Sequence, residues 1–158
     1  MDFTIRKQNL ARPEIYYSKG YYKYGEAVAA LEQGILDAKT NGNANWEYGG
    51  ITVLAKFGVY YNSNIVTSHQ AHAIYWSVST LDSIASRVQI LALHHYHPLG
   101  RGVVKRAFSD ADMTTFKNFK AKWGGFQGIY LIDKYGTRKF NGTTDYRGVA
   151  CSEGISLC

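Results

Sequence analysis

The segment VQILALHHYHP, residues 88–98, decides the fold of this 158-residue chain. Its first half is strongly apolar, and an apolar run of this length is typical of a buried strand. The segment ends with three histidines within four residues, at positions 94, 95 and 97. Because side chains on a strand alternate between two faces, His95 and His97 share one face, and His94 shares the other with Tyr96. Two imidazoles two residues apart on one face are a natural chelating pair for Zn²⁺, and a histidine-rich strand end with hydrogen-bonded or solvated rings is the alternative.

Upstream of this segment the sequence predicts one long helix and several short elements. Apolar residues recur at three- and four-residue steps from Glu26, and Asn41-Gly42-Asn43 ends that helix. A strand is predicted at 46–54, further short strands at 57–61, 65–68 and 73–78, and a short helix at 81–87. Residues 1–23 are rich in tyrosine without a clear period, and we expect an irregular N-terminal extension or a loose strand there.

Downstream of the segment, a glycine-containing basic loop (98–108) leads into a second clear helix. Its apolar stripe consists of Met113, Phe116, Phe119 and Trp123, and Gly124-Gly125 ends it. Strands at 126–132 and 137–140 flank a turn and predict a hairpin. Because the strands do not alternate regularly with long helices, we expect one α/β domain over residues 1–158, with a mixed or antiparallel central sheet.

Composition and charge exclude several classes of protein. With 46% apolar residues and two prolines the chain is expected to fold, and it has no apolar run near the roughly 20 residues of a membrane-spanning helix. The N-terminus has no apolar signal core, so no cleavable export signal is expected. The net charge of +6 suits an acidic partner, which can be nucleic acid, an anionic protein surface or an acidic immunity protein.

The second predicted helix begins with Ser109-Asp110-Ala111-Asp112. The simplest interpretation is a capping box with Ser109 as the N-cap. Asp112 precedes Phe116 by four residues and lies in phase with the apolar stripe, which places it on the buried side of the helix. A buried carboxylate needs a strong partner, and a metal ion is the strongest available. Ser109 can therefore cap the helix while Asp112 binds a metal.

Glu47, in Trp46-Glu47-Tyr48-Gly49-Gly50, can supply the general base that a catalytic zinc site needs. The alternative is an exposed glutamate at the start of a strand, because charged side chains lie mostly at the surface. The two glycines after Glu47 would let another backbone or a ligand approach closely.

Together these three segments resemble the signature of the JAMM (JAB/MPN) zinc metalloproteases. That signature is a glutamate after the first helix, then H-x-H-P, then S-x-x-D at a helix start, and the similarity here spans roughly residues 26–132. The chain is most similar to the short bacterial members that form C-terminal toxin domains of large secreted or contact-delivered proteins. Eleven residues separate His97 from Ser109, against seven in the common eukaryotic pattern, and the additional residues fall in the loop 98–108, where insertions are tolerated.

The resemblance implies a JAMM/cytidine-deaminase-like α/β fold, with a mixed central sheet flanked by helices. It implies a zinc-dependent peptidase or isopeptidase that is secreted, or delivered into a target cell, as part of a larger protein. His95, His97 and Asp112 would hold Zn²⁺ with water as the fourth ligand. Glu47 would take a proton from that water and pass it to the leaving amine, and Ser109 would hydrogen-bond the developing oxyanion.

Two other classes of function fit parts of the sequence. The basic charge, the clustered histidines and the thirteen tyrosines suit a nuclease toxin, so nucleic acid stays open as a partner. A JAMM-like fold without activity would be a binding module. Asp112 together with Glu47 favours the peptidase, because a metal-free nuclease needs no carboxylate on a buried helix stripe, and inactive relatives typically lose the glutamate or a ligand.

The loop 98–108 carries Arg101, Lys105 and Arg106 and connects the two halves of the proposed metal site. A loop held at both ends by catalytic elements is well placed to contact a protein or peptide substrate, or an acidic neutralising protein. The alternative is that these three side chains are merely solvated.

The remaining histidines and the two cysteines are not predicted to take part in the site. We expect His94 to pack in the core, and His69 and His72 to be ordinary surface residues of a turn. Cys151 and Cys158 are too few for a disulfide scaffold or a four-cysteine zinc site, and they can form one short disulfide or remain two free thiols.

Overall fold

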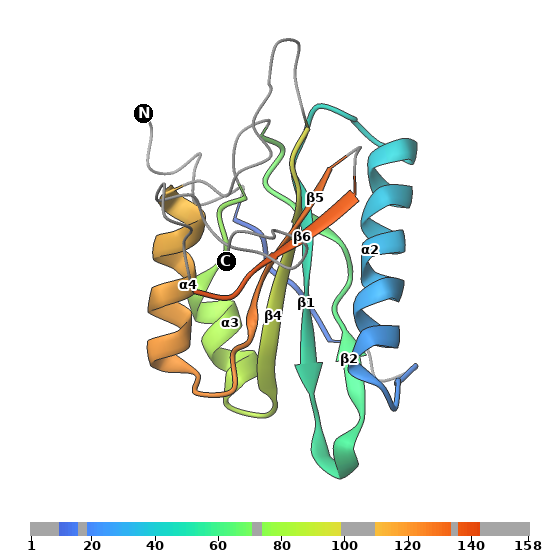
Figure 1. Ribbon diagram of the computed structural model, residues 1–158. Coiled ribbons are helices and arrows are strands. Elements are labelled where there is room, and N and C mark those ends of the chain that lie inside the picture. Colours follow the sequence, from blue (N-terminus) through green and yellow to red (C-terminus); the bar gives the residue numbers. More distant parts are fainter. Residues whose placement is uncertain (1–9, 16–18, 71–73, 99–109, 134–135, 143–158) are drawn as a thin grey trace, which may run out of the picture.

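The computed structural model describes residues 10–15, 19–70, 74–98, 110–133 and 136–142 (Figure 1). In chain order the elements are α2 (Tyr24–Asn41), β1 (Tyr48–Leu54), the 3₁₀ turn η1 (Lys56–Gly58), β2 (Tyr60–Asn62), β3 (Val66–Thr67), α3 (Val78–Ala85), β4 (Gln89–Tyr96), α4 (Asp110–Lys122), β5 (Gly128–Asp133) and β6 (Gly136–Phe140). None of the described helices combines the length and apolar character needed to cross a membrane.

The six strands form one mixed sheet in the order β2-β1-β4-β5-β6, with β3 paired to β1. The decisive segment forms the central strand β4, which pairs antiparallel with β1 and parallel with β5. A parallel pair needs a crossover connection, and α4 lies in that connection. Helix α2 covers one face of the sheet, and α3 and α4 cover the other (Figure 1). The predicted α/β fold with a mixed central sheet flanked by helices is confirmed.

Each face of the sheet has its own core. The larger cluster lies under α3 and α4, where the predicted stripe residues Phe116 and Phe119 pack on Leu93 and Leu131 of the sheet. The smaller cluster lies under α2 and includes Leu31. Because both faces are covered, β4 is buried along nearly its whole length, which explains its continuous apolar run.

Two predicted strands are wrong in part. Residues 56–58 form the η1 turn and not the start of a strand, because Phe57 and Gly58 both have positive φ, at 66° and 72°. At 73–78 the described residues form no extended strand. Trp76 makes one isolated bridge with Ala11, and the Ser77 hydroxyl accepts a hydrogen bond from the backbone N–H of Thr80, so that α3 begins earlier than predicted.

Gly49 and Gly50, which follow Glu47, allow close contacts, and the atoms that approach them most closely belong to β4 and α2 of the same chain. A Cβ on Gly49 would lie 2.5 Å from the backbone oxygen of His94. A Cβ on Gly50 would lie 2.9 Å from a methyl carbon of Leu31 in α2. The two glycines therefore allow β1 to press against β4 on one side and against α2 on the other.

We expect Gly49→Ala to destabilise the protein by about 1–3 kcal/mol, because the contacting atom belongs to the backbone of β4 and cannot turn away. Gly25→Ala is the matched control, since nothing lies within 4 Å of a Cβ there, and it should change the free energy of unfolding by less than about 1 kcal/mol. Urea unfolding of the three proteins measures this difference. Equal stability of Gly49→Ala and the wild type would contradict the close approach of the strands.

Candidate metal centre

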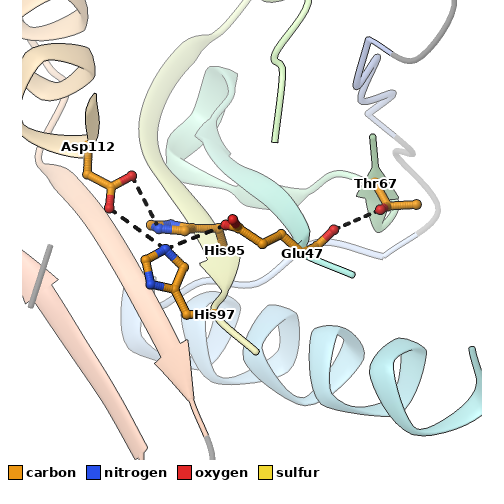
Figure 2. Close-up of polar contacts among 5 residues, drawn as sticks. All are labelled: Glu47, Thr67, His95, His97 and Asp112. Atoms are coloured by element: carbon orange, nitrogen blue, oxygen red, sulfur yellow. Dashed lines mark hydrogen bonds and ion pairs between the residues drawn. The ribbon is translucent and has the colours of Figure 1, made fainter. Parts of the chain in front are cut away.

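The predicted site residues meet where β1 begins and β4 ends. Because the two strands are antiparallel, with Gly49 opposite His95, the residue before β1 faces the end of β4. Glu47 occupies that position before β1 (Figure 2). His97 directly follows β4, and its backbone N–H donates to the Ile132 carbonyl at 2.9 Å.

Glu47, His95 and His97 lie close enough together to hold a metal ion. Each offers one ligand atom, and these three atoms lie within 4.8 Å of one another. Nε2 of His97 is 3.5 Å from Oε1 of Glu47, and the ring centroids of the two histidines are 4.6 Å apart. The strand alternation of β4 thus presents both imidazoles on one face, toward the same carboxylate.

Asp112 reaches the same point from the first turn of α4. Its Oδ1 lies 3.4 Å from Nε2 of His95, and its Oδ2 lies 3.8 Å from Nε2 of His97 (Figure 2). Nε2 of His95 is buried and makes no hydrogen bond within the described part of the chain. A buried ring nitrogen that faces carboxylates without such a bond has the chemistry of a metal ligand, so the residues present fit a metal ion.

The remaining predicted site residues lie outside the described residues. These are Ser109, the predicted oxyanion donor, and the loop residues Arg101, Lys105 and Arg106. Asp110, the residue after Ser109, belongs to α4, and the predicted cap itself lies outside the described residues.

Glu47 is buried, so the alternative of an exposed glutamate is wrong. Its backbone N–H donates to the Gln70 carbonyl at 2.8 Å, and its own carbonyl accepts from the Thr67 hydroxyl at 2.7 Å (Figure 2). Burial raises the pKa of its carboxyl to about 7, and the Asp112 charge adds to this rise while His95 opposes it. Glu47 is therefore held rigidly, with a carboxyl that can both take and release a proton near neutral pH.

The two histidines of the site have opposite pKa shifts. Burial and the charge of a protonated His95 together lower the pKa of His97 to about 4, against the opposing charges of Asp112 and Asp133. Burial also acts to lower the pKa of His95, but the Asp112 and Glu47 carboxylates outweigh it, and the net shift is upward. A metal ligand must be a neutral imidazole, and burial favours that form of His97. His95 would lose its proton on metal binding, because the cation would take the place of that proton between the carboxylates.

His94 points to the opposite face and belongs to the core. Its ring is fully buried, stacks on Tyr130 at 4.7 Å between centroids, and places Nε2 2.9 Å from the Thr52 hydroxyl. His69 is exposed and contacts the ring of Trp46, whereas His72 lies outside the described residues. Cys151 and Cys158 also lie outside them.

Asp133 is a buried carboxylate near the site, in the segment between the two predicted strands 126–132 and 137–140. It is 3% exposed at the end of β5, the strand parallel to β4. Burial lowers the pKa of His97, and the charge of Asp133 opposes that shift. An acidic residue at the end of an apolar strand was the available signal, but its relevance depends on β5 lying beside β4.

Comparison with known proteins finds no matching family model, no similar curated protein and no similar solved structure. The structure therefore defines this protein as an α/β domain in which three residues at the end of the central strand lie close enough together to hold a metal ion.

The raised pKa of Glu47 predicts a pH-dependent stability of the metal-free protein. The folded state binds the proton more tightly than the unfolded state, whose carboxyl has its ordinary pKa of 4.5. The resulting stabilisation is complete below pH 4.5 and is lost as the pH rises through about 7, with a total of roughly 3 kcal/mol. The Glu47→Gln side chain does not titrate. The free energy of unfolding of this variant, minus that of the wild type, should therefore increase as the pH rises from 4.5 through about 7. Urea unfolding in a chelating buffer at several pH values measures the difference, and a constant difference would show that the carboxyl is not perturbed.

Proposed function

We propose that this protein is a zinc-dependent peptidase or isopeptidase of the JAMM type. The observation that carries the proposal is the meeting of Glu47, His95, His97 and Asp112 at one end of the sheet. These residues come from the three segments that resemble the JAMM signature. Two imidazoles and a carboxylate are a typical ligand set for catalytic zinc, which keeps a position open for water.

In this proposal His95, His97 and Asp112 hold the metal, and Glu47 is the general base. Both carboxylate oxygens of Asp112 face the histidine Nε2 atoms, whereas the pKa of Glu47, about 7, suits proton transfer at neutral pH. A bound zinc ion would supply Lewis acidity, activating water and polarising the scissile carbonyl.

The protein's own groups would do the remaining chemistry. Glu47 accepts the proton at its carboxylate and delivers it to the nitrogen of the leaving amine, while its backbone contacts keep it in place. Ser109, immediately before α4, is the proposed donor to the developing oxyanion.

The proposed biological role is that of a toxin or effector domain, secreted or delivered as part of a larger protein. Arg101, Lys105 and Arg106 are the proposed contacts for an acidic substrate surface or an acidic neutralising protein. This part of the proposal is supported by the resemblance to toxin-associated JAMM domains and by the net charge of +6.

Metal analysis tests the ligand set directly. Elemental analysis of the purified protein after incubation with zinc and desalting should find about one zinc per chain, in the stoichiometry of a single catalytic site. His97→Ala and Asp112→Asn should lose it. His69→Ala is the matched control, because that histidine is exposed and lies outside the ligand set, and it should keep the metal. A wild type without zinc, or a His97→Ala protein that keeps it, would refute the metal centre.

Glu47→Gln separates the general base from the ligands. The variant should keep its zinc but lose growth inhibition when expressed in a susceptible bacterial cell, because turnover should fall about 10²–10⁴-fold. Elemental analysis and a growth assay on the same variant give the two readouts. If the variant is as toxic as the wild type, Glu47 has no catalytic role, and if it loses zinc, Glu47 is a ligand.

A further inference from the structure

The end of the sheet opposite the metal centre carries a projecting hairpin. Strands β1 and β2 are antiparallel, with Leu54 opposite Tyr60, and the backbone N–H of Ala55 donates to the Val59 carbonyl at 2.9 Å. Between them, η1 forms the turn. Figure 1 shows this hairpin extending beyond the neighbouring strands.

Phe57, at the tip of the hairpin, has a strained backbone and an exposed aromatic ring, and both destabilise the isolated protein. Its backbone lies in the left-handed region, with φ 66° and ψ 17°, where glycine and asparagine are at ease and a bulky side chain is strained. Its ring is 98% exposed to water. Strained residues cluster at functional sites, so the combination of a strained backbone and an exposed ring makes Phe57 a candidate contact for something outside the chain.

The surroundings of Phe57 are basic. Lys56 precedes it and lines a groove of about 320 Å³ together with Arg87, and none of the described residues that line this groove is acidic. Neither of these cations forms an ion pair with a described residue.

A second aromatic and basic pair lies beside the hairpin. Tyr21 and Tyr60 exchange backbone hydrogen bonds of 2.8 Å, so the next two residues, Tyr22 and Lys23, follow directly after a residue paired with β2. Tyr22 is 83% exposed. Lys23 is the N-cap of α2 without a side-chain capping bond, at a helix end that disfavours a cation. We call Tyr22, Lys23, Lys56, Phe57 and Arg87 the hairpin patch.

We propose that the hairpin patch docks this protein onto an anionic membrane surface. Phe57 and Tyr22 would enter the interfacial layer, where aromatic side chains are favoured, and the three cations would lie at the level of anionic headgroups. A bilayer accepts a convex, projecting aromatic without a complementary pocket, whereas a protein partner would need one. The basic charge of the patch matches an anionic lipid surface.

Membrane docking and the proposed peptidase activity are separable. Strand β1, seven residues long, lies between Glu47 and the turn that carries Phe57, which corresponds to about 23 Å. The metal centre therefore stays clear of the bilayer when the hairpin patch is docked, and the proposal does not depend on the chemistry of the site.

Vesicle co-sedimentation with the full chain tests the docking surface. The wild type should bind vesicles containing about 30% phosphatidylserine and should not bind pure phosphatidylcholine vesicles, and binding should weaken as salt rises. The double variant Lys56→Gln/Arg87→Gln should bind more weakly at low salt and show a smaller salt dependence.

Phe57→Asn is the sharpest variant, because asparagine suits the left-handed backbone and should leave the fold intact. Its binding to the anionic vesicles should fall at least about tenfold, while its melting temperature should stay unchanged or rise by about 2–4 °C. Val78→Asn is the matched control, since Val78 is a half-exposed apolar residue at the start of α3, and it should bind like the wild type.

Three results would overturn the proposal. The first is a wild-type protein that does not bind the anionic vesicles, or that binds them no better than the pure phosphatidylcholine vesicles. The second is a folded Phe57→Asn protein that binds like the wild type, and the third is a Val78→Asn protein that loses binding to the same extent. Metal content should be identical in all of these variants, which keeps the result independent of the metal centre.

Discussion

The antiparallel pairing of β1 with β4 is the constraint on which the rest of the structure depends. It places Gly49 opposite His95, with no side chain between the strand and the backbone oxygen of His94. The close approach brings the residue before β1 to the end of β4, so that Glu47 meets the two histidines. A shift of this register by one residue would turn His95 and His97 away from the α4 face and separate the carboxylate from both rings.

The carboxylates and imidazoles of the site are buried together, and their mutual attraction offsets part of the cost of removing each from water. Two carboxylates and two imidazoles lie together with little exposure to water, and each alone would be costly to bury. Burial dominates the pKa values of Glu47 and His97, whereas the neighbouring carboxylates prevail at His95. Such opposed shifts within one cluster are typical of functional sites, because a stable core has no need to retain them.

The two ends of β1 carry different properties. One end meets β4 and α4 in a buried, polar cluster, where the backbone of Glu47 accepts a hydrogen bond from the Thr67 hydroxyl and donates one to the Gln70 carbonyl. The other end continues into a projecting turn whose backbone is strained and whose aromatic ring lies in water. A rigid sheet with both faces covered keeps these ends apart, so changes at one need not disturb the other.

The amino-acid sequence alone predicts the features that short-range periodicity controls. Strand alternation placed His95 and His97 on one face, and helical phase placed Asp112 with Phe116 on the packed side of α4. It also predicted an α/β fold with a mixed or antiparallel sheet. The three-dimensional structure was needed to show that β5 lies parallel beside β4 and brings Asp133 near the site, and that Glu47 is buried with a raised pKa. The physical reason is that strand order, burial and electrostatics arise between segments distant in the chain. For the same reason, local pattern extended a strand through Phe57, where the paired hairpin holds a left-handed turn.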